Sequence, residues 1–257
     1  MPSCTIDQMS VPDRVEAAHL LLSLDPPPWH LRHSRAVAET AAWLAGRIAG
    51  RGIPIDRRLV EAAALLHDVD KLLPAGDPAA RLPHGGGSAA WLARHGAAEL
   101  ARATANHPVT RLAEEERYRR WSAFSTREER VVAYADKRCG QRLEPMAERF
   151  AAWERRFPVA EEVESRAGTR AGDGDRGPAA AAGVGASRDR AAAAGVGASR
   201  DRAATAGVGP SWDRATLLRV RRRAERLEAD VCQAAGILPA EVRRLRWTAA
   251  ALARART

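Results

Sequence analysis

The sequence predicts an all-α fold, and three observations support the prediction. Alanine, leucine and arginine, which favour helices, dominate the composition. Aromatic residues make up only 5% of the chain, and β-branched residues do not alternate with polar ones as they would in a half-buried strand. Apolar residues account for 46% of the 257 residues, which is enough for a sizeable core.

The first five helices are expected between the N-terminus and residue 106. The second of them carries apolar or imidazole residues at three- and four-residue spacing, which predicts one inward-facing stripe: His33, Val37, Ala41, Leu44 and Ile48. In the third, Val60, Ala64 and His67 share the apolar side, and Asp68 lies one step around the helix. These helices are expected at 13–24, 30–50, 56–70, 86–95 and 97–106.

The remaining helices are expected on either side of a region of different composition. In the range 126–140, Val132 and Asp136 share a face with Cys139 or Gly140, and Cys139 is expected to act as a small buried hydrophobe. Amphipathic helix pattern returns after the interruption, in RATLLRVRRRAERLEADVCQAAGILPAEVRRLRW. These helices are expected at 126–140, 141–157, 213–235 and 239–255.

The interruption contains a tandem repeat of 12 residues. Residues 179–190 and 191–202 both read AAAAGVGASRDR, and 203–214 read AATAGVGPSWDR. The repeat is rich in glycine and has little to bury, which is typical of a disordered linker rather than of a solenoid. We therefore expect a helical core at 13–158, a disordered insertion at 159–211 and C-terminal helices at 212–255 that pack on the core.

Charge and cysteine content narrow the class of protein. The formal net charge of +9 allows a nucleic-acid partner, but arginines scattered along helices favour a solvated surface instead. The cysteines Cys4, Cys139 and Cys232 are far apart and form no disulfide or metal pattern. No signal-peptide pattern and no apolar run of membrane-spanning length is present. We expect a cytoplasmic protein without a membrane partner, whose oligomeric state is unknown.

Three inward helical faces each carry an imidazole or a carboxylate. His67 and Asp68 lie inside an apolar run, ALLHDVDKLLP, where an uncompensated carboxylate would be costly. His33 precedes this pair by 67 − 33 = 34 residues, and Asp136 follows it by 136 − 68 = 68 residues. Histidine and aspartate from facing helices of a bundle are typical ligands of a divalent metal. The ion would compensate the buried carboxylates.

The three sequence contexts around these residues resemble the H…HD…D signature of the HD-domain superfamily of metal-dependent phosphohydrolases. They read HSRAVAETAAWLA at His33, ALLHDVDK at the His67-Asp68 pair and VVAYADK at Asp136. The resemblance covers about residues 13–157. It departs from the family pattern at Asp70, where glycine often precedes the lysine, and this adds a negative charge near the metal. The resemblance implies an HD-domain helical bundle that binds iron, manganese or another transition metal.

Two further histidines resemble the ligands of a second ion in some HD-domain subfamilies. His84 in LPHGGGS and His107 in ATANHPV follow the pair, and the pattern H…HD…H…H…D is similar to the subfamily that hydrolyses dinucleoside tetraphosphates symmetrically. In that reading Asp68 would bridge two ions. His30 is expected at the surface or behind the ligands. The aromatic residues Trp91, Trp121 and Tyr134 are expected either to stack on a base or to pack in the core.

The distribution of lysine adds a further prediction. Of the 41 basic residues only Lys71 and Lys137 are lysine, and each directly follows a metal motif. A compact ammonium differs from the planar fork of arginine, so both lysines, with Arg138, are expected to hold substrate phosphate or to pair with the metal carboxylates.

The expected function is hydrolysis of a phosphate ester or anhydride, with a nucleotide or dinucleoside polyphosphate as substrate. Lys71, Lys137 and His107 are the expected catalytic residues, and His107 or His84 could protonate the leaving oxygen. Two alternatives remain open: a non-catalytic HD fold that binds a nucleotide, and an arginine-rich protein that binds nucleic acid.

Overall fold

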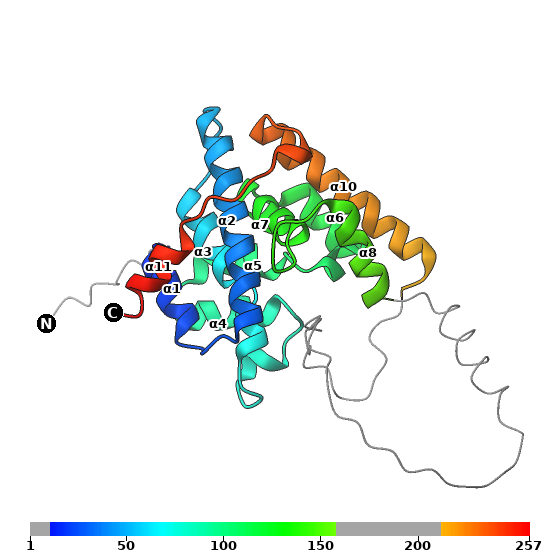
Figure 1. The fold of residues 1–257 in the computed structure, drawn as a ribbon. Coiled ribbons are helices and arrows are strands. Elements are labelled where there is room, and N and C mark those ends of the chain that lie inside the picture. The colour runs from blue at the N-terminus through cyan, green and yellow to red at the C-terminus, as the bar shows by residue number, and fades with distance from the viewer. Residues whose placement is uncertain (1–10, 158–211) are drawn as a thin grey trace, which may run out of the picture.

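The computed structural model describes residues 11–157 and 212–257, and within these ranges the regular structure is helical (Figure 1). A single isolated bridge between Cys139 and Leu143 is the extent of β pairing in the described residues. The predicted all-α class is confirmed, whereas the predicted insertion at 159–211 lies outside the described residues. The α-helices are α1 (Arg14–Leu22), α2 (Pro28–Gly50), α3 (Arg57–Leu66), α4 (Gly86–Arg94), α5 (Ala101–Ala105), α6 (Glu115–Phe124), α7 (Arg127–Arg138), α8 (Met146–Arg156), α10 (Arg214–Ala235) and α11 (Thr248–Arg254).

Helix α2 runs through the middle of the bundle and packs against α3 and α7 (Figure 1). Its predicted inward stripe is confirmed, since Val37, Ala41, Leu44 and Ile48 are fully buried. Helix α7 begins with a capping box in which Thr126 and Glu129 satisfy each other's backbone N–H groups, which stabilises its first turn. The packing of these three helices sets the positions of the metal-ligand candidates.

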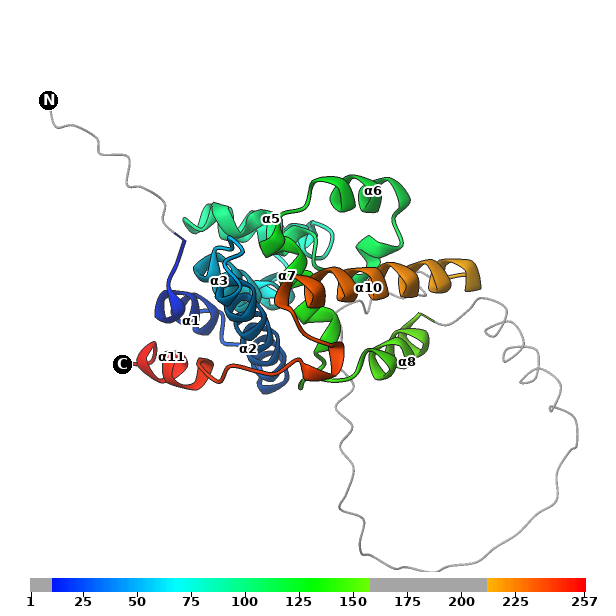
Figure 2. The ribbon, with the colours of Figure 1, turned by 90° about the horizontal axis from the view of Figure 1, so that it is seen from above.

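The C-terminal part of the chain packs on the same core. Helix α10 lies along α7, and α11 lies beside α1 at the opposite side of the molecule (Figure 2). Between α10 and α11 the chain crosses α2, where Leu245 N–H donates to the Glu39 carbonyl at 2.9 Å and Arg244 pairs with the Glu39 carboxylate at 2.8 Å. The predicted continuous helix at 239–255 is therefore wrong, because this crossing requires extended backbone after a 3₁₀ turn at Pro239–Glu241.

Three other helix predictions need correction. Helix α6 was not expected, because none of its residues is fully buried and only Tyr118 and Trp121 pack partly against the apolar core, which is too short a pattern to mark a helix in the sequence. Helix α8 starts at Met146 rather than at 141, directly after Pro145. Helix α3 ends at Leu66, with His67 as its C-cap, so the His67-Asp68 pair lies at a helix end.

The described residues on either side of the predicted insertion meet each other. The rings of Phe157, after α8, and Trp212, before α10, stack with centroids 4.0 Å apart and an angle of 14° between their planes. Both rings are buried, in a small apolar cluster with Met146, Phe150 and Val220. The core therefore closes across the two ends of the segment 158–211.

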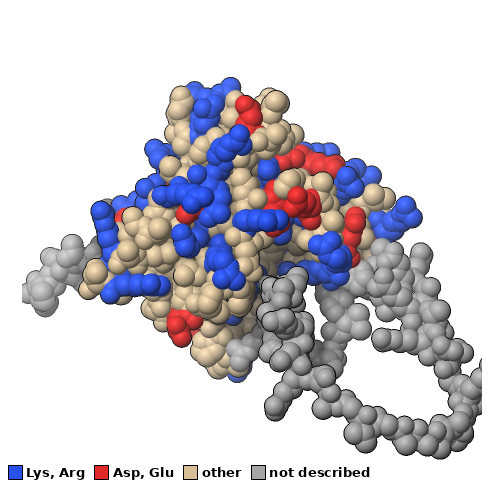
Figure 3. Space-filling model, in the orientation of Figure 1, with Lys and Arg blue, Asp and Glu red and all other residues tan. Residues whose placement is uncertain are grey.

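The surface charge is mixed rather than collected into one basic face. On the face seen in Figure 3, basic side chains are scattered over much of the surface, and acidic ones lie among them on the right of the view. Arginines do gather in a shallow groove of about 490 Å³ between α6 and α10, lined among others by Arg119, Arg222 and Arg226, but Glu115 lies in the same groove. In the described ranges, no helix is both long and apolar enough to cross a bilayer.

Candidate metal centre

The fold brings the six candidate metal ligands into one cluster. His33 lies near the start of α2, His67 and Asp68 at the end of α3, and Asp136 in the last turn of α7. The other two, His84 and His107, stand in the connections just before α4 and just after α5. The cluster is therefore positioned mainly at helix ends, where the chain can turn a side chain toward a common centre.

Four of the ligand candidates lie close together, namely His33, His67, Asp136 and the Oδ2 side of Asp68. The Nε2 atoms of His33 and His67 are 3.0 Å apart, closer than two imidazolium groups would approach. Asp136 Oδ1 lies 3.5 Å from His33 Nε2 and 3.6 Å from His67 Nε2, while Asp68 Oδ2 lies 3.3 and 3.5 Å from the same two atoms. His33, His67 and Asp136 lie close enough together to share one ion, and this donor set, with Asp68 Oδ2 beside it, fits a divalent transition metal.

The second oxygen of Asp68 faces the two remaining histidines. Asp68 Oδ1 lies 3.2 Å from His107 Nε2 and 3.3 Å from His84 Nε2. His67, Asp68 and His107 together form another group of donors close enough to share an ion. One carboxylate thus presents one oxygen to each of two groups of imidazoles.

The four histidines of the cluster share one arrangement of their ring nitrogens. In each of them Nε2 points to the cluster and Nδ1 has an acceptor behind it. The acceptors are the Gly140 carbonyl for His33 at 2.6 Å, the Ala64 carbonyl for His67 at 2.8 Å, the Thr104 carbonyl for His107 at 2.6 Å and the Asp70 carboxylate for His84 at 3.0 Å. Such acceptors hold the proton on Nδ1 and leave the Nε2 lone pair free for a metal.

The electrostatics of the cluster favour ionised carboxylates. Burial alone would raise the pKa of Asp68, but electrostatic interaction with His67 and Lys71 holds that pKa well below its usual range. Burial likewise opposes the ionisation of Asp136, whose pKa is nevertheless held low by its contacts with His33, His67 and Lys137. Both carboxylates are therefore anionic in the folded protein, as metal ligands must be.

Two buried histidines, His107 and His30, have lowered pKa values. Burial lowers the pKa of His107 to about 4, and it lowers the pKa of His30 to about 4. His107 is therefore neutral near pH 7, which suits a ligand better than a proton donor. His30 is fully buried rather than on the surface, and its Nε2 contacts the Asp68 carbonyl at 3.1 Å, so it lies directly behind the ligands.

The two lysines occupy different environments. Lys71 Nζ donates to Asp68 Oδ2 at 2.7 Å, and its side chain is 25% exposed. Lys137 is 1% exposed, donates to the His107 carbonyl and lies 3.7 Å from Asp136 Oδ2; burial lowers its pKa. Both contact metal-ligand candidates, but Lys71 is the one that solvent reaches.

Arg138 is directed away from the cluster. Its guanidinium Nη1 donates to the Tyr134 hydroxyl at 2.6 Å and to the Pro239 carbonyl at 3.1 Å, and it pairs with Glu228 at 3.2 Å. None of these groups is a metal-ligand candidate. The side chain joins α7 to the C-terminal segment, so we do not assign it to substrate phosphate.

Two residues that were not predicted to belong to the site, Asp70 and Arg111, contact His84. Asp70 holds its Nδ1, and Arg111, which is buried, donates from Nη2 to the His84 carbonyl at 3.0 Å. Asp70 was noticed only as a departure from the family pattern, which was the available signal. Arg111 gave none, because one arginine among so many has no distinctive spacing.

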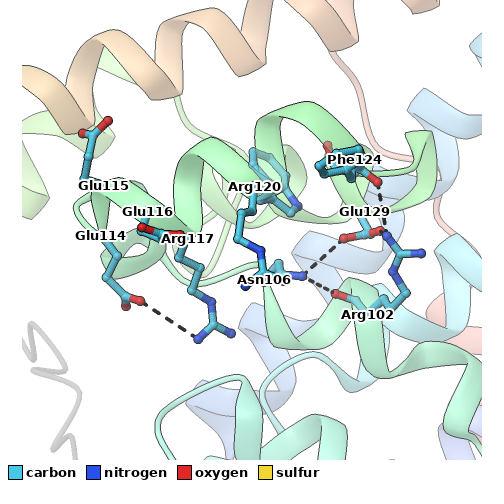
Figure 4. A pocket seen from close by; sticks show the side chains of 11 residues that line it. Arg102, Asn106, Glu114, Glu115, Glu116, Arg117, Arg120, Phe124 and Glu129 are labelled. Atoms are coloured by element: carbon cyan, nitrogen blue, oxygen red, sulfur yellow. Dashed lines mark hydrogen bonds and ion pairs between the residues drawn. The ribbon is translucent and has the colours of Figure 1, made fainter.

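A surface pocket of about 630 Å³ lies between α5, α6 and the first turn of α7 (Figure 4). Asn106, the neighbour of His107, lines it, but none of the metal-ligand candidates does. Trp121 also lines it, whereas Trp91 and Tyr134 are buried in the core. Of the three aromatic residues considered for base stacking, only Trp121 thus borders this pocket.

Comparison with known proteins supports the family resemblance. Residues 31–139 match the family model of the HD domain, a range that contains all six candidate ligands. No curated protein and no solved structure gives a significant match to the chain. The family match and the geometry of the cluster together support an HD domain, of the HD-domain superfamily, in residues 31–139.

Proposed function

We propose that this protein is a metal-dependent phosphohydrolase that uses two divalent ions. The observation that carries the proposal is the position of Asp68, whose Oδ2 faces His33 and His67 while its Oδ1 faces His84 and His107. In this arrangement His33 and His67 would help to hold one ion, His84 and His107 would help to hold a second, and Asp68 could contribute an oxygen to each. When bound, such ions lower the pKa of a coordinated water and neutralise charge on phosphoryl oxygens.

The exposure of the side chains suggests how a phosphate group would reach the ions. His67, Asp68 and His107 form a floor that is at most 1% exposed. His84 at 34% and Lys71 at 25% are the most exposed members of the cluster and its contacts. Substrate phosphate would therefore approach over His84 and Lys71, and the ammonium of Lys71 would balance part of its negative charge.

The substrate class we propose is a nucleotide, with dinucleoside polyphosphates as the first candidates. The order H…HD…H…H…D resembles the subfamily that cleaves dinucleoside tetraphosphates symmetrically, and all six of its residues are potential ligands here. The surface pocket that Asn106 lines contains the Trp121 ring, which is suited to stack on a base, while its three arginines stand among four glutamates. Imidazole and carboxylate donors favour iron, manganese or a similar metal.

The test combines metal analysis with turnover. Chelator-stripped protein is reloaded with Mn²⁺ or Fe²⁺, and metal per chain is measured beside phosphate release from nucleotides, dinucleoside polyphosphates, cyclic dinucleotides and sugar phosphates. We expect about two ions per chain and turnover of at least one nucleotide class. Asp68→Ala should lose turnover and most of the metal, because it removes the shared ligand.

A matched control separates the site from general damage. Asp230→Ala removes a carboxylate of α10 that pairs with Arg130 at the surface, and it should leave metal content and turnover unchanged. Full metal and normal turnover in Asp68→Ala would contradict the proposal. Metal binding without turnover of any substrate would favour a non-catalytic HD fold instead.

A further inference from the structure

His84 differs from the other histidines of the cluster in what holds its ring. His33, His67 and His107 each direct Nδ1 at a backbone carbonyl, which no side-chain substitution removes. His84 Nδ1 instead lies 3.1 Å from Asp70 Oδ1 and 3.0 Å from Asp70 Oδ2. The orientation and tautomer of this one imidazole therefore depend on a side chain.

The segment that carries His84 is built around Asp70. The Gly85 N–H donates to Asp70 Oδ2 at 2.7 Å, and the Asp70 N–H donates to Ser88 Oγ at 3.1 Å. Gly85 adopts a φ of 80°, which glycine tolerates without strain. A Cβ on Gly87 would lie 2.9 Å from the Asp70 Cβ and 2.6 Å from the Ala79 carbonyl. The HGGGS stretch therefore fits closely against Asp70.

We propose that Asp70 is a positioning residue that keeps the proton of His84 on Nδ1 and presents Nε2 to the second ion. This inference rests on the two-ion function proposed above. A carboxylate behind a ligating imidazole fixes its ring and increases its basicity, which strengthens its bond to a metal. Asp70 stands where the family pattern often has glycine, so this chain uses a carboxylate where the pattern does not supply one.

Asp70 acts through His84 rather than as a ligand of its own. Asp68, Asp70 and His84 lie close enough together to share an ion, but both Asp70 oxygens contact His84 Nδ1 and Oδ2 also accepts from the Gly85 N–H, so we assign Asp70 a role behind the imidazole. Asp68 Oδ1, by contrast, lies on the far side of the His84 ring, 3.3 Å from Nε2.

The experiment is a titration of chelator-stripped protein with Mn²⁺, followed by calorimetry and checked by metal analysis of dialysed samples. Wild-type protein should bind two ions per chain. Asp70→Asn should weaken the second ion by about 10–100-fold and leave the first unchanged, because an amide presents N–H hydrogens toward His84 Nδ1 and competes for the wrong tautomer. Asp77→Asn, which alters a nearby aspartate that caps a 3₁₀ turn, is the matched control and should bind as wild type.

A double mutant distinguishes positioning from direct ligation. If Asp70 acts through His84, then Asp70→Asn should weaken Mn²⁺ binding no further in a His84→Ala background. A further loss there would overturn the positioning role in favour of a direct ligand. Two unchanged ions in Asp70→Asn would overturn the inference and leave the proposed function standing, whereas a single ion in wild type would overturn the two-ion proposal itself.

Folding is followed separately by the thermal midpoint of the metal-free proteins. Asp70→Ser, which is smaller than asparagine and lacks its amide donor, provides a second variant should Asp70→Asn fail to fold. It should also lose affinity for the second ion, since the acceptor behind His84 is gone. A folded Asp70→Ser protein with wild-type affinity for both ions would overturn the proposal.

Discussion

Both lysines of this chain contact the metal cluster, one near the protein surface and the other inside the core. Lys71 reaches Asp68 from a partly exposed position, and Lys137 holds the His107 carbonyl from inside the core. A chain that otherwise uses arginine retains an ammonium at both places. For Lys137 the physical reason is space, because the planar fork of arginine is larger than the ammonium that fills this buried position.

This difference in environment predicts that Lys137→Arg and Lys71→Arg affect different properties, stability and turnover respectively. Lys137→Arg should lower the free energy of unfolding by about 1–3 kcal/mol, because it overpacks a fully buried site. Lys71→Arg should change stability by less than about 0.5 kcal/mol, but it should slow turnover by about 10–100-fold while metal content is retained. Denaturant unfolding and metal analysis of both variants check this, and wild-type turnover in Lys71→Arg would contradict the role of its ammonium.

Among the elements, α7 connects the metal cluster to the C-terminal helices. One end of its last turn supplies Asp136 to the cluster, and Tyr134 and Arg138 of the same turns contact Glu228 of α10. The Tyr134 hydroxyl donates to Glu228 Oε1 at 2.8 Å, and the side chain of Arg138 is only 7% exposed. Glu228 therefore compensates a guanidinium that the docking of α10 has removed from water.

Removal of Glu228 should destabilise this contact without touching the metal. Glu228→Ala leaves the Arg138 charge largely buried and unpaired, and it should cost about 3 kcal/mol of unfolding free energy. Glu225→Ala, one turn away on α10, removes only an exposed pair with Arg221 and should cost less than about 0.5 kcal/mol. Denaturant unfolding measures both, and metal per chain should stay at the wild-type value. Equal stabilities of the two variants would show that α10 does not depend on this pair.

At the scale of the whole molecule, the two described parts of the chain meet on either side of residues 158–211. Phe157 and Trp212 stack directly, so the chain leaves and re-enters the core at neighbouring points. This arrangement is what an insertion between two helices of one domain requires. It agrees with the amphipathic pattern that resumes after the repeat, and the buried faces of α10 contact α7 and α2.

The insertion should therefore be replaceable. Residues 159–211 would be exchanged for a Gly/Ser linker of about eight residues. Its span of about 15 Å is long enough to join the two ends. The thermal midpoint should stay within about 3 °C of wild type, and metal content and turnover should not change. A large loss of stability or turnover would mean that the segment contributes to the core or the site. Trp212→Ala is the positive control, since it removes a buried ring of the closing stack.

The sequence by itself determined the helical class, the order of most helices and the identity of six residues that meet in one cluster. Helical periodicity placed His33 on an inward face, and the local context of the His67-Asp68 pair and of Asp136 was distinctive enough for recognition. Prediction from the sequence failed for elements that show no clear helical periodicity. Helix α6 contacts the core only through partly buried side chains, and residues 242–247 are not helical where Glu39 of a distant helix binds Leu245 and Arg244.

Only the tertiary structure decided which groups act on which side of the cluster. It placed one oxygen of Asp68 toward each pair of histidines, turned Arg138 toward Glu228 and put Asp70 behind His84. Ring orientation and the second contact of a carboxylate depend on groups that are distant in sequence, and spacing along one chain does not encode them. The residue types that can bind a metal can therefore be identified from the sequence, whereas the histidine tautomers that allow binding are set by packing.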